Sequence, residues 1–154
     1  MQELRPATTV MNSNLTKVQT SALCQELGGG VKLTLLFKAS IHGFTGAAFH
    51  QRCDTRGPSV SVGYNRSGYV FGGYTTAPFC QSGQYVSDPK AFLFTFKGDK
   101  LLKYLPINNA YAVRMTPNSG PYFGKNLVLM NGDAAVTYSN PGSCYISLQK
   151  KCTK

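Results

Sequence analysis

The sequence is poor in acidic residues and contains no long apolar run, and each lack argues against a class of protein. Six Asp and Glu residues stand against sixteen Lys and Arg, and the six are isolated from one another along the chain. A hydrolase built on paired carboxylates is therefore not indicated. No segment approaches the ~18 apolar residues of a membrane-spanning helix, so we expect no membrane span.

Paired cysteines and a secretory leader are lacking as well. The cysteines are odd in number, widely spaced and without a C-x-x-C motif: Cys24, Cys53, Cys80, Cys144 and Cys152. The first residues show no basic segment followed by an apolar one, so no signal peptide is indicated. We therefore expect a cytoplasmic protein with reduced thiols.

Positive charge is in excess. The net charge of +10 would attract anionic partners such as RNA, phosphoinositides or an acidic protein face. The basic residues are nevertheless scattered singly, and only Lys150, Lys151 and Lys154 lie close together. The RNP pattern of an RRM is absent. The favoured interpretation is a dispersed, solvated surface, and electrostatic binding of nucleic acid is the alternative.

The pattern of apolar residues favours one domain of mostly β structure. The 154 residues suffice for one domain with its own core. Within the central stretch Gly57–Lys97, Val60 and Val62 alternate with small residues, as in a half-buried strand. Segment 91–96 is apolar at nearly every position, as in a strand covered on both faces. The paired glycines at 72–73 predict a bulge or a closely packed neighbour.

Other strands and two helices complete the expected fold. A helix is predicted from Ser13 or Asn14 to about Leu27, stopped by the glycines at 28–30. Thr45 is expected to cap a second helix that ends near Cys53. We expect the apolar face of the first helix to carry Leu15, Val18 and Ala22, with Leu27 near the same face. Residues 1–12 are expected to be irregular.

Short turns between consecutive strands predict antiparallel sheets rather than βαβ units. In segment 31–38, Val31, Leu33, Leu35 and Phe37 would face the core, with Lys32, Thr34 and Lys38 outward. The remaining strands are expected at 101–106, 111–115, 126–130 and 134–138. The fold class is thus α+β, mostly β, with a β-sandwich flanked by short helices.

One pair of residues could carry chemistry. His50 and Cys53 would share a face of the second helix, and a Cys–His pair can form a nucleophile. The opposing and favoured interpretation is that Cys53 packs inward and His50 is structural. Segment 120–126 resembles a nucleotide-binding loop but has the wrong spacing and no Ser or Thr after its lysine. Two histidines, His42 and His50, with scattered cysteines do not match zinc-ligand spacing. We therefore expect no catalytic, cofactor-binding or metal-binding residues.

Several motifs, taken together, resemble the TLDc domain family. They stand in family order and at family spacing over about residues 31–145. The matching segments are Phe37–Phe44, Ala48–Asp54, Gly57–Val60, Gly68–Thr75, Ser87–Phe94 and Tyr138–Ser143. With His42 in place of a frequent Asp, and a helical lead before Val31, the chain looks most like the N-terminal domain of interferon-induced protein 44-like proteins.

The resemblance implies a two-sheet antiparallel β-sandwich and an intracellular module without catalytic residues. It also implies a protein partner, with a family link to the vacuolar proton pump, and roles in oxidative-stress protection or interferon-type antiviral response. We divide the chain into a lead and helix (1–30), a TLDc-like domain (31–145) and a basic tail (146–154). The family's closing strand and the GTPase-like domain of the interferon-induced branch are expected to be lacking, which would expose a sheet edge.

Overall fold

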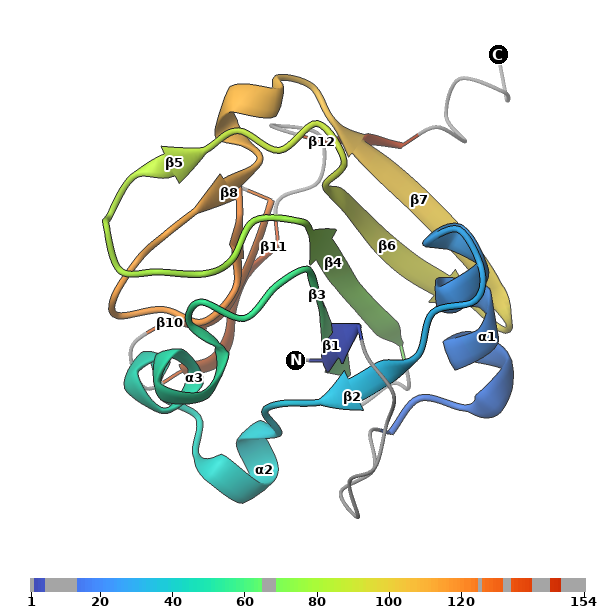
Figure 1. The fold of residues 1–154 in the computed structure, drawn as a ribbon, viewed down its shortest axis with the longest axis horizontal. Helices are drawn as coiled ribbons and strands as arrows, with labels where there is room; N and C mark the ends of the chain where they lie inside the picture. Colours follow the sequence, from blue (N-terminus) through green and yellow to red (C-terminus); the bar gives the residue numbers. More distant parts are fainter. Residues whose placement is uncertain are drawn as a thin grey trace.

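The structure is a computed structural model, and it describes residues 2–4, 14–64, 69–124, 126–131, 134–139 and 145–147. Three α-helices and one 3₁₀ helix lie among the strands (Figure 1). The helices are α1 (Lys17–Glu26), α2 (Ala39–His42), α3 (Gly46–Cys53) and the 3₁₀ helix η1 (Asn109–Tyr111).

The largest sheet has seven antiparallel strands in the order β12-β7-β6-β4-β3-β1-β2. Its strands are β1 (Gln2–Leu4), β2 (Leu33–Leu35), β3 (Ser59–Tyr64), β4 (Val70–Thr75), β6 (Phe92–Lys97), β7 (Lys100–Pro106) and β12 (Tyr145–Ser147). A second sheet, in the order β11-β10-β9, contains β9 (Tyr122–Phe123), β10 (Leu127–Asn131) and β11 (Ala134–Ser139). A third, small sheet pairs β5 (Tyr85–Val86) with β8 (Val113–Arg114).

The large sheet is covered on both faces. Helix α1 lies against one face, and the strands of the two smaller sheets lie on the other (Figure 1). Leu23 of α1, which is 0% exposed, packs with Val60, Phe92 and Phe94 on the helix side. On the opposite side, Phe123 belongs to a second core cluster. The predicted mostly-β sandwich with short flanking helices is thus confirmed.

The glycines at 72 and 73 are required by close neighbours, as the sequence predicted. A Cβ on Gly72 would lie 1.9 Å from the carbonyl oxygen of Ser61 in the adjacent strand. A Cβ on Gly73 would lie 2.6 Å from the ring of Phe123 in the second sheet. Neither gap admits a methyl group. Gly72 therefore allows β4 to pair closely with β3 within the sheet, and Gly73 allows the second sheet to pack on β4.

The first helix differs from its prediction in both its start and its buried face. Its cap is Thr16, whose hydroxyl accepts from Gln19 N while the Gln19 side chain accepts from Thr16 N. This reciprocal capping box satisfies two free backbone donors and fixes the start at Lys17. Leu15, Ala22 and Leu27 pack against the core as predicted. Val18 is exposed instead, and Gln19 and Leu23 are the buried residues at the centre of this face.

Two predictions for the N-terminal part are wrong. Residues 1–12 are not wholly irregular, because β1 pairs with both β2 and β3 and fills a gap in the sheet. The strand predicted over 31–38 is only three residues long, and its Thr34 is buried rather than outward. The strand β1 has only three residues and is paired on both sides, with β2 and β3. Because this pairing supports it, it needs no alternating pattern of its own, and the sequence does not reveal it.

Near the C-terminus the structure also departs from expectation. Segment 111–115 is the end of η1 followed by the two-residue β8 rather than one strand. Ile146 of β12 pairs with Leu105 of β7, so the sheet edge expected to be open is paired at this point. The segment assigned to a basic tail therefore begins inside a strand, and its remainder, 148–154, lies outside the described residues.

Candidate functional site

His50 and Cys53, the pair with catalytic potential in the sequence, lie on α3. Thr45 caps this helix as predicted, accepting from Ala48 N through its hydroxyl. The start of the helix is pressed against the loop at 116–119, since a Cβ on Gly46 would lie 2.5 Å from the backbone of Asn118. The helix and the loop are therefore fixed against each other by backbone contact.

The His50 ring joins α3 to this loop. Its Nδ1 donates to the Asp54 carboxylate at 2.5 Å, and its Nε2 faces the carbonyl oxygens of Thr116 and Ser119 at 2.7 and 2.9 Å. Asp54 in turn accepts from the Gln81 side chain at 3.0 Å. All the groups that face the two ring nitrogens are oxygen atoms of Asp54, Thr116 and Ser119, so neither nitrogen is directed at the Cys53 thiol. A histidine held in this way is not placed to take a proton from a thiol.

Cys53 is not an active nucleophile in this environment. Its side chain is only 1% exposed and lies in the core cluster that contains Phe49 and Phe79. Burial raises the pKa of the Cys53 thiol to about 12, and the charge of Asp54 adds to the rise. Arg52 and Arg56 lower the pKa, but they do not offset the burial. Because the thiolate is the reactive form, the thiol is inert near neutral pH.

Asp88 is the other buried charged side chain with many partners. Its carboxylate accepts from Thr75 Oγ1 at 2.6 Å, from Thr76 N and Oγ1 at 2.7 and 2.9 Å, and from Lys90 N at 3.0 Å. Burial raises the pKa of Asp88, but these hydrogen bonds outweigh it and hold the pKa below its usual range. The carboxylate thus ties the end of β4 to the loop before β6, and it has no lone pair directed at a ligand site.

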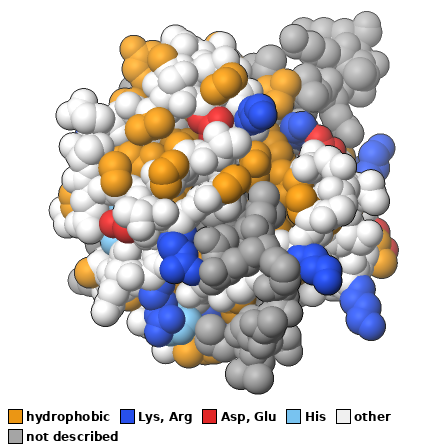
Figure 2. Space-filling model, viewed as in Figure 1, with side chains coloured by type: hydrophobic (Ala, Val, Ile, Leu, Met, Phe, Trp, Pro, Cys, Tyr) orange, Lys and Arg blue, Asp and Glu red, His pale blue; other side chains and the backbone are white. Residues whose placement is uncertain are grey.

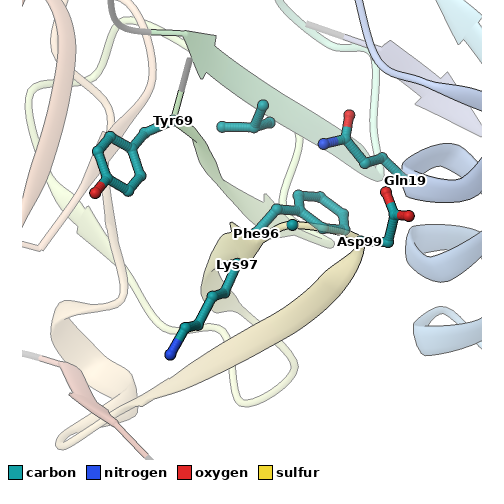
Figure 3. Close-up of a pocket in the computed structure, with 7 residues that line it drawn as sticks. Gln19, Tyr69, Phe96, Lys97 and Asp99 are labelled. Carbon is teal, nitrogen blue, oxygen red and sulfur yellow. The ribbon is translucent and has the colours of Figure 1, made fainter. Parts of the chain in front are cut away.

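A shallow pocket of about 370 Å³ lies beside the β6–β7 turn. Figure 3 shows Tyr69 on one side and Gln19 and Asp99 on the other, with the Lys97 side chain directed away from them. It contains none of the residues that the sequence singled out as candidates for chemistry, and its polar groups do not converge on one point. The pocket therefore offers no arrangement for catalysis.

The structure assembles one group of residues that the sequence did not reveal. We call it the Arg114 cluster, and it consists of Arg114 with three tyrosines: Tyr85, Tyr111 and Tyr122. The Arg114 guanidinium lies over the rings of Tyr85 and Tyr122, at 5.4 and 5.7 Å from their centroids. Tyr111 meets Tyr85 edge to face at 5.3 Å. Its members come from four separate segments, so no local motif could have signalled it.

The other basic side chains that the structure describes do not form one stripe on the face drawn in Figure 2. Figure 2 shows Lys and Arg side chains spread singly over the visible face. Among the residues whose side chains are described, no group of three His, Cys, Asp or Glu is arranged to hold a metal ion. Of the described helices, none has the length and apolar character needed to cross a membrane.

Comparison with known proteins identifies the family. The sequence profile of the TLDc domain matches residues 7–153. Interferon-induced protein 44 of Homo sapiens is 33% identical over 76 residues, which are 49% of this chain and 16% of that protein. MTOR-associated protein MEAK7 of Mus musculus is 38% identical over 64 residues, 40% of this chain and 13% of that protein. The matched segment is thus a small part of either relative.

The resemblance drawn from the motifs is confirmed, and the match extends beyond the 31–145 segment on both sides. The antiparallel sheets of the structure agree with the two-sheet sandwich that the resemblance to the TLDc family implied. The chain belongs to the TLDc domain family.

Proposed function

We propose that this chain is a non-catalytic, cytoplasmic protein-binding module that acts in a stress or interferon-type response. The observation that carries the proposal is the state of the Cys53–His50 pair. Cys53 is buried with a raised thiol pKa, and both ring nitrogens of His50 are engaged by Asp54 and the loop at 116–119. The two residues that could have carried out chemistry, His50 and Cys53, instead stabilise the fold. The protein is therefore proposed to act by binding partners at its surface.

The names of the relatives support a role in a cellular response, and they differ in which response it is. One relative is named for its induction by interferon and another for its association with MTOR. Association with other proteins is the property that a catalytically inert sandwich can supply. The family resemblance makes the vacuolar proton pump the first partner to test.

The test is a binding measurement with purified proteins. The intact chain is immobilised and titrated with the purified peripheral sector of the vacuolar proton pump, and in parallel it is used to capture proteins from cytosol of interferon-treated cells. A saturable complex with the pump or with a captured, repurified protein supports the module. Thiol-dependent turnover of a substrate by the purified chain would overturn the proposal, as would failure of every candidate to bind saturably.

A further inference from the structure

The Arg114 cluster is a rigid arrangement at the surface. Tyr85 and Arg114 are directly opposed in the β5–β8 pairing. The loop before β5 is fixed by Gly83 N donating to Met115 O at 2.6 Å and by Met115 N donating to Gln84 O at 2.9 Å. The rings of Tyr85 and Tyr122 beneath the guanidinium and these backbone bonds restrict where the guanidinium can lie. Little side-chain freedom remains to be lost on binding, which favours recognition.

The polar groups of the cluster are available. The Arg114 Nε faces the carbonyl oxygen of Gly83 at 3.4 Å, and its terminal amino groups have no partner within the described part of the chain. The hydroxyls of the three tyrosines likewise make no hydrogen bond to a described residue. A guanidinium that lies over aromatic rings keeps N–H donors for another partner, and its fork of donors matches the two oxygens of a carboxylate.

Apolar surface adjoins these polar groups. Tyr111 is 50% exposed and Ile107 is 55% exposed, while Tyr85, Arg114 and Tyr122 are partly exposed. Figure 2 shows hydrophobic side chains gathered over the region of β5 and η1, in the upper left of the view. Tyrosine and arginine are the residues that most often dominate protein interfaces. The surface therefore combines the Arg114 guanidinium with exposed apolar side chains, an arrangement suited to binding a polypeptide.

The charge of Arg114 is uncompensated within the described part of the chain. Four carboxylates belong to residues whose side chains are described, and three of these are engaged elsewhere: Glu26 with Lys103, Asp54 with His50, and Asp88 with its four donors. The fourth, Asp99, lines the pocket beside the β6–β7 turn. With a net charge of +10, the chain as a whole also attracts an anionic partner.

The geometry points to the Arg114 cluster as the docking site for an acidic segment of a partner protein. A Glu or Asp side chain of that segment accepts two hydrogen bonds from the Arg114 guanidinium, and flanking apolar residues pack on Tyr111 and Ile107. This inference rests on the proposed binding function and names the chemistry of the partner. A nucleic acid would instead require a run of cations along its backbone, and the described basic side chains are scattered.

The test is a selection of peptides followed by affinity measurements. A phage-displayed library of random peptides is selected on the intact, folded chain, and the enriched peptides are synthesised and titrated. We expect enrichment of Asp and Glu. We expect Arg114→Met, which keeps the aliphatic stem over the tyrosines, to weaken binding at least about tenfold, because hydrogen bonds to a charged group are lost. Arg114→Lys should restore only part of the affinity, because lysine is a point charge without the fork.

Two further variants separate a local effect from misfolding. Tyr111→Ala removes an exposed side chain and should also weaken binding, whereas Arg52→Met removes an exposed arginine on α3 and should leave it unchanged. Each variant is checked for an unaltered near-ultraviolet circular dichroism spectrum.

Several results would overturn the inference. Enrichment of neutral or basic peptides, or equal binding by wild type and Arg114→Met, would contradict the acidic docking site while leaving the binding module standing. A failure to select any Arg114-dependent peptide would contradict it too. Displacement of the selected peptides by single-stranded RNA, with RNA binding itself lost in Arg114→Met, would assign the site to nucleic acid instead.

Discussion

Gly73 of β4 lies directly beneath the ring of Phe123 of β9, and this contact joins the two main layers of the sandwich. A Cβ at position 73 would lie 2.6 to 2.8 Å from three atoms of the ring. Phe123 is itself fully buried in the core cluster between the sheets. The spacing of the layers at this point is therefore set by the absence of a side chain on Gly73.

Gly73→Ala should destabilise the protein, because the added methyl group overpacks this contact. The expected loss in the free energy of unfolding is about 1–3 kcal/mol, measured by urea denaturation. Phe123→Leu alone should also be destabilising, because it removes buried volume. The double variant Gly73→Ala with Phe123→Leu should cost less than the sum of the two single changes. Additive losses would show that the two residues do not constrain each other.

Asp88→Asn should destabilise the protein in a pH-dependent way. The substitution replaces a carboxylate that accepts from Thr75, Thr76 and Lys90 with an amide that has donors of its own, at an expected cost of about 2–3 kcal/mol near neutral pH. The folded-state pKa of Asp88 is lowered. Its contribution is therefore present above the unfolded pKa of roughly 3.9 and is lost as pH falls through the folded value.

The measurement is the difference in unfolding free energy between wild type and Asp88→Asn as pH is lowered from neutral to strongly acidic. The difference should shrink in acid. A difference that is independent of pH would show that the charge of Asp88 makes no contribution.

Cys53 should resist thiol reagents in the folded protein. Its side chain is 1% exposed and its thiol pKa is raised to about 12 by burial, so labelling at neutral pH should proceed only through unfolding. Cys24 and Cys80, which are partly exposed, serve as internal references for site-resolved mass spectrometry. Because the unfolded thiol ionises at lower pH than the folded one, Cys53 should also reduce stability as pH rises above about 8.5. Labelling of Cys53 as fast as of Cys80 would contradict this environment.

His50→Gln should loosen the loop at 116–119. Glutamine cannot reach Asp54 on one side and the carbonyl oxygens of Thr116 and Ser119 on the other at once, as the two ring nitrogens of His50 do. The expected cost is about 2–3 kcal/mol, since polar groups near the core lose their partners. Hydrogen exchange should accelerate at Gly120, whose amide donates to Leu129 O at 2.9 Å beside the loop. An unchanged exchange rate there would mean that the ring does not hold the loop.

The sequence predicts the elements whose signals lie in neighbouring residues, and it misses the elements that are stabilised by pairing with distant segments. Thr45 as a cap, the glycine stop at 28–30 and the strand β3 all rest on neighbouring residues, and the structure agrees with them. The half-buried pattern predicted within β3 is wrong, because Ser59 and Ser61 are buried as fully as Val60: the strand is covered on both faces. The short strands β1 and β12 are formed by pairing with distant strands, so their own residues carry little pattern. The start of α1 is set by the capping box of Thr16 and Gln19, whereas Ser13 and Asn14 are equally good caps by residue type alone.

The candidate site follows the same division. The proximity of His50 and Cys53 follows from helical spacing alone, but their inertness depends on partners from segments 66 and 69 residues away from His50. The Arg114 cluster is assembled from β5, η1, β8 and β9 by tertiary contacts, and one tyrosine in each of three segments, with an arginine in the fourth, gives no sign of it.

The most direct test of the central claim compares partner binding by wild type and Cys53→Ala. If the chain acts through its surface, Cys53→Ala should bind a captured protein partner with a dissociation constant within about twofold of wild type, measured well below the melting temperature of both. The binding should also persist in reducing buffer. A loss of tenfold or more in the folded variant, or a partner recovered in disulfide linkage to Cys53, would contradict a non-catalytic binding module.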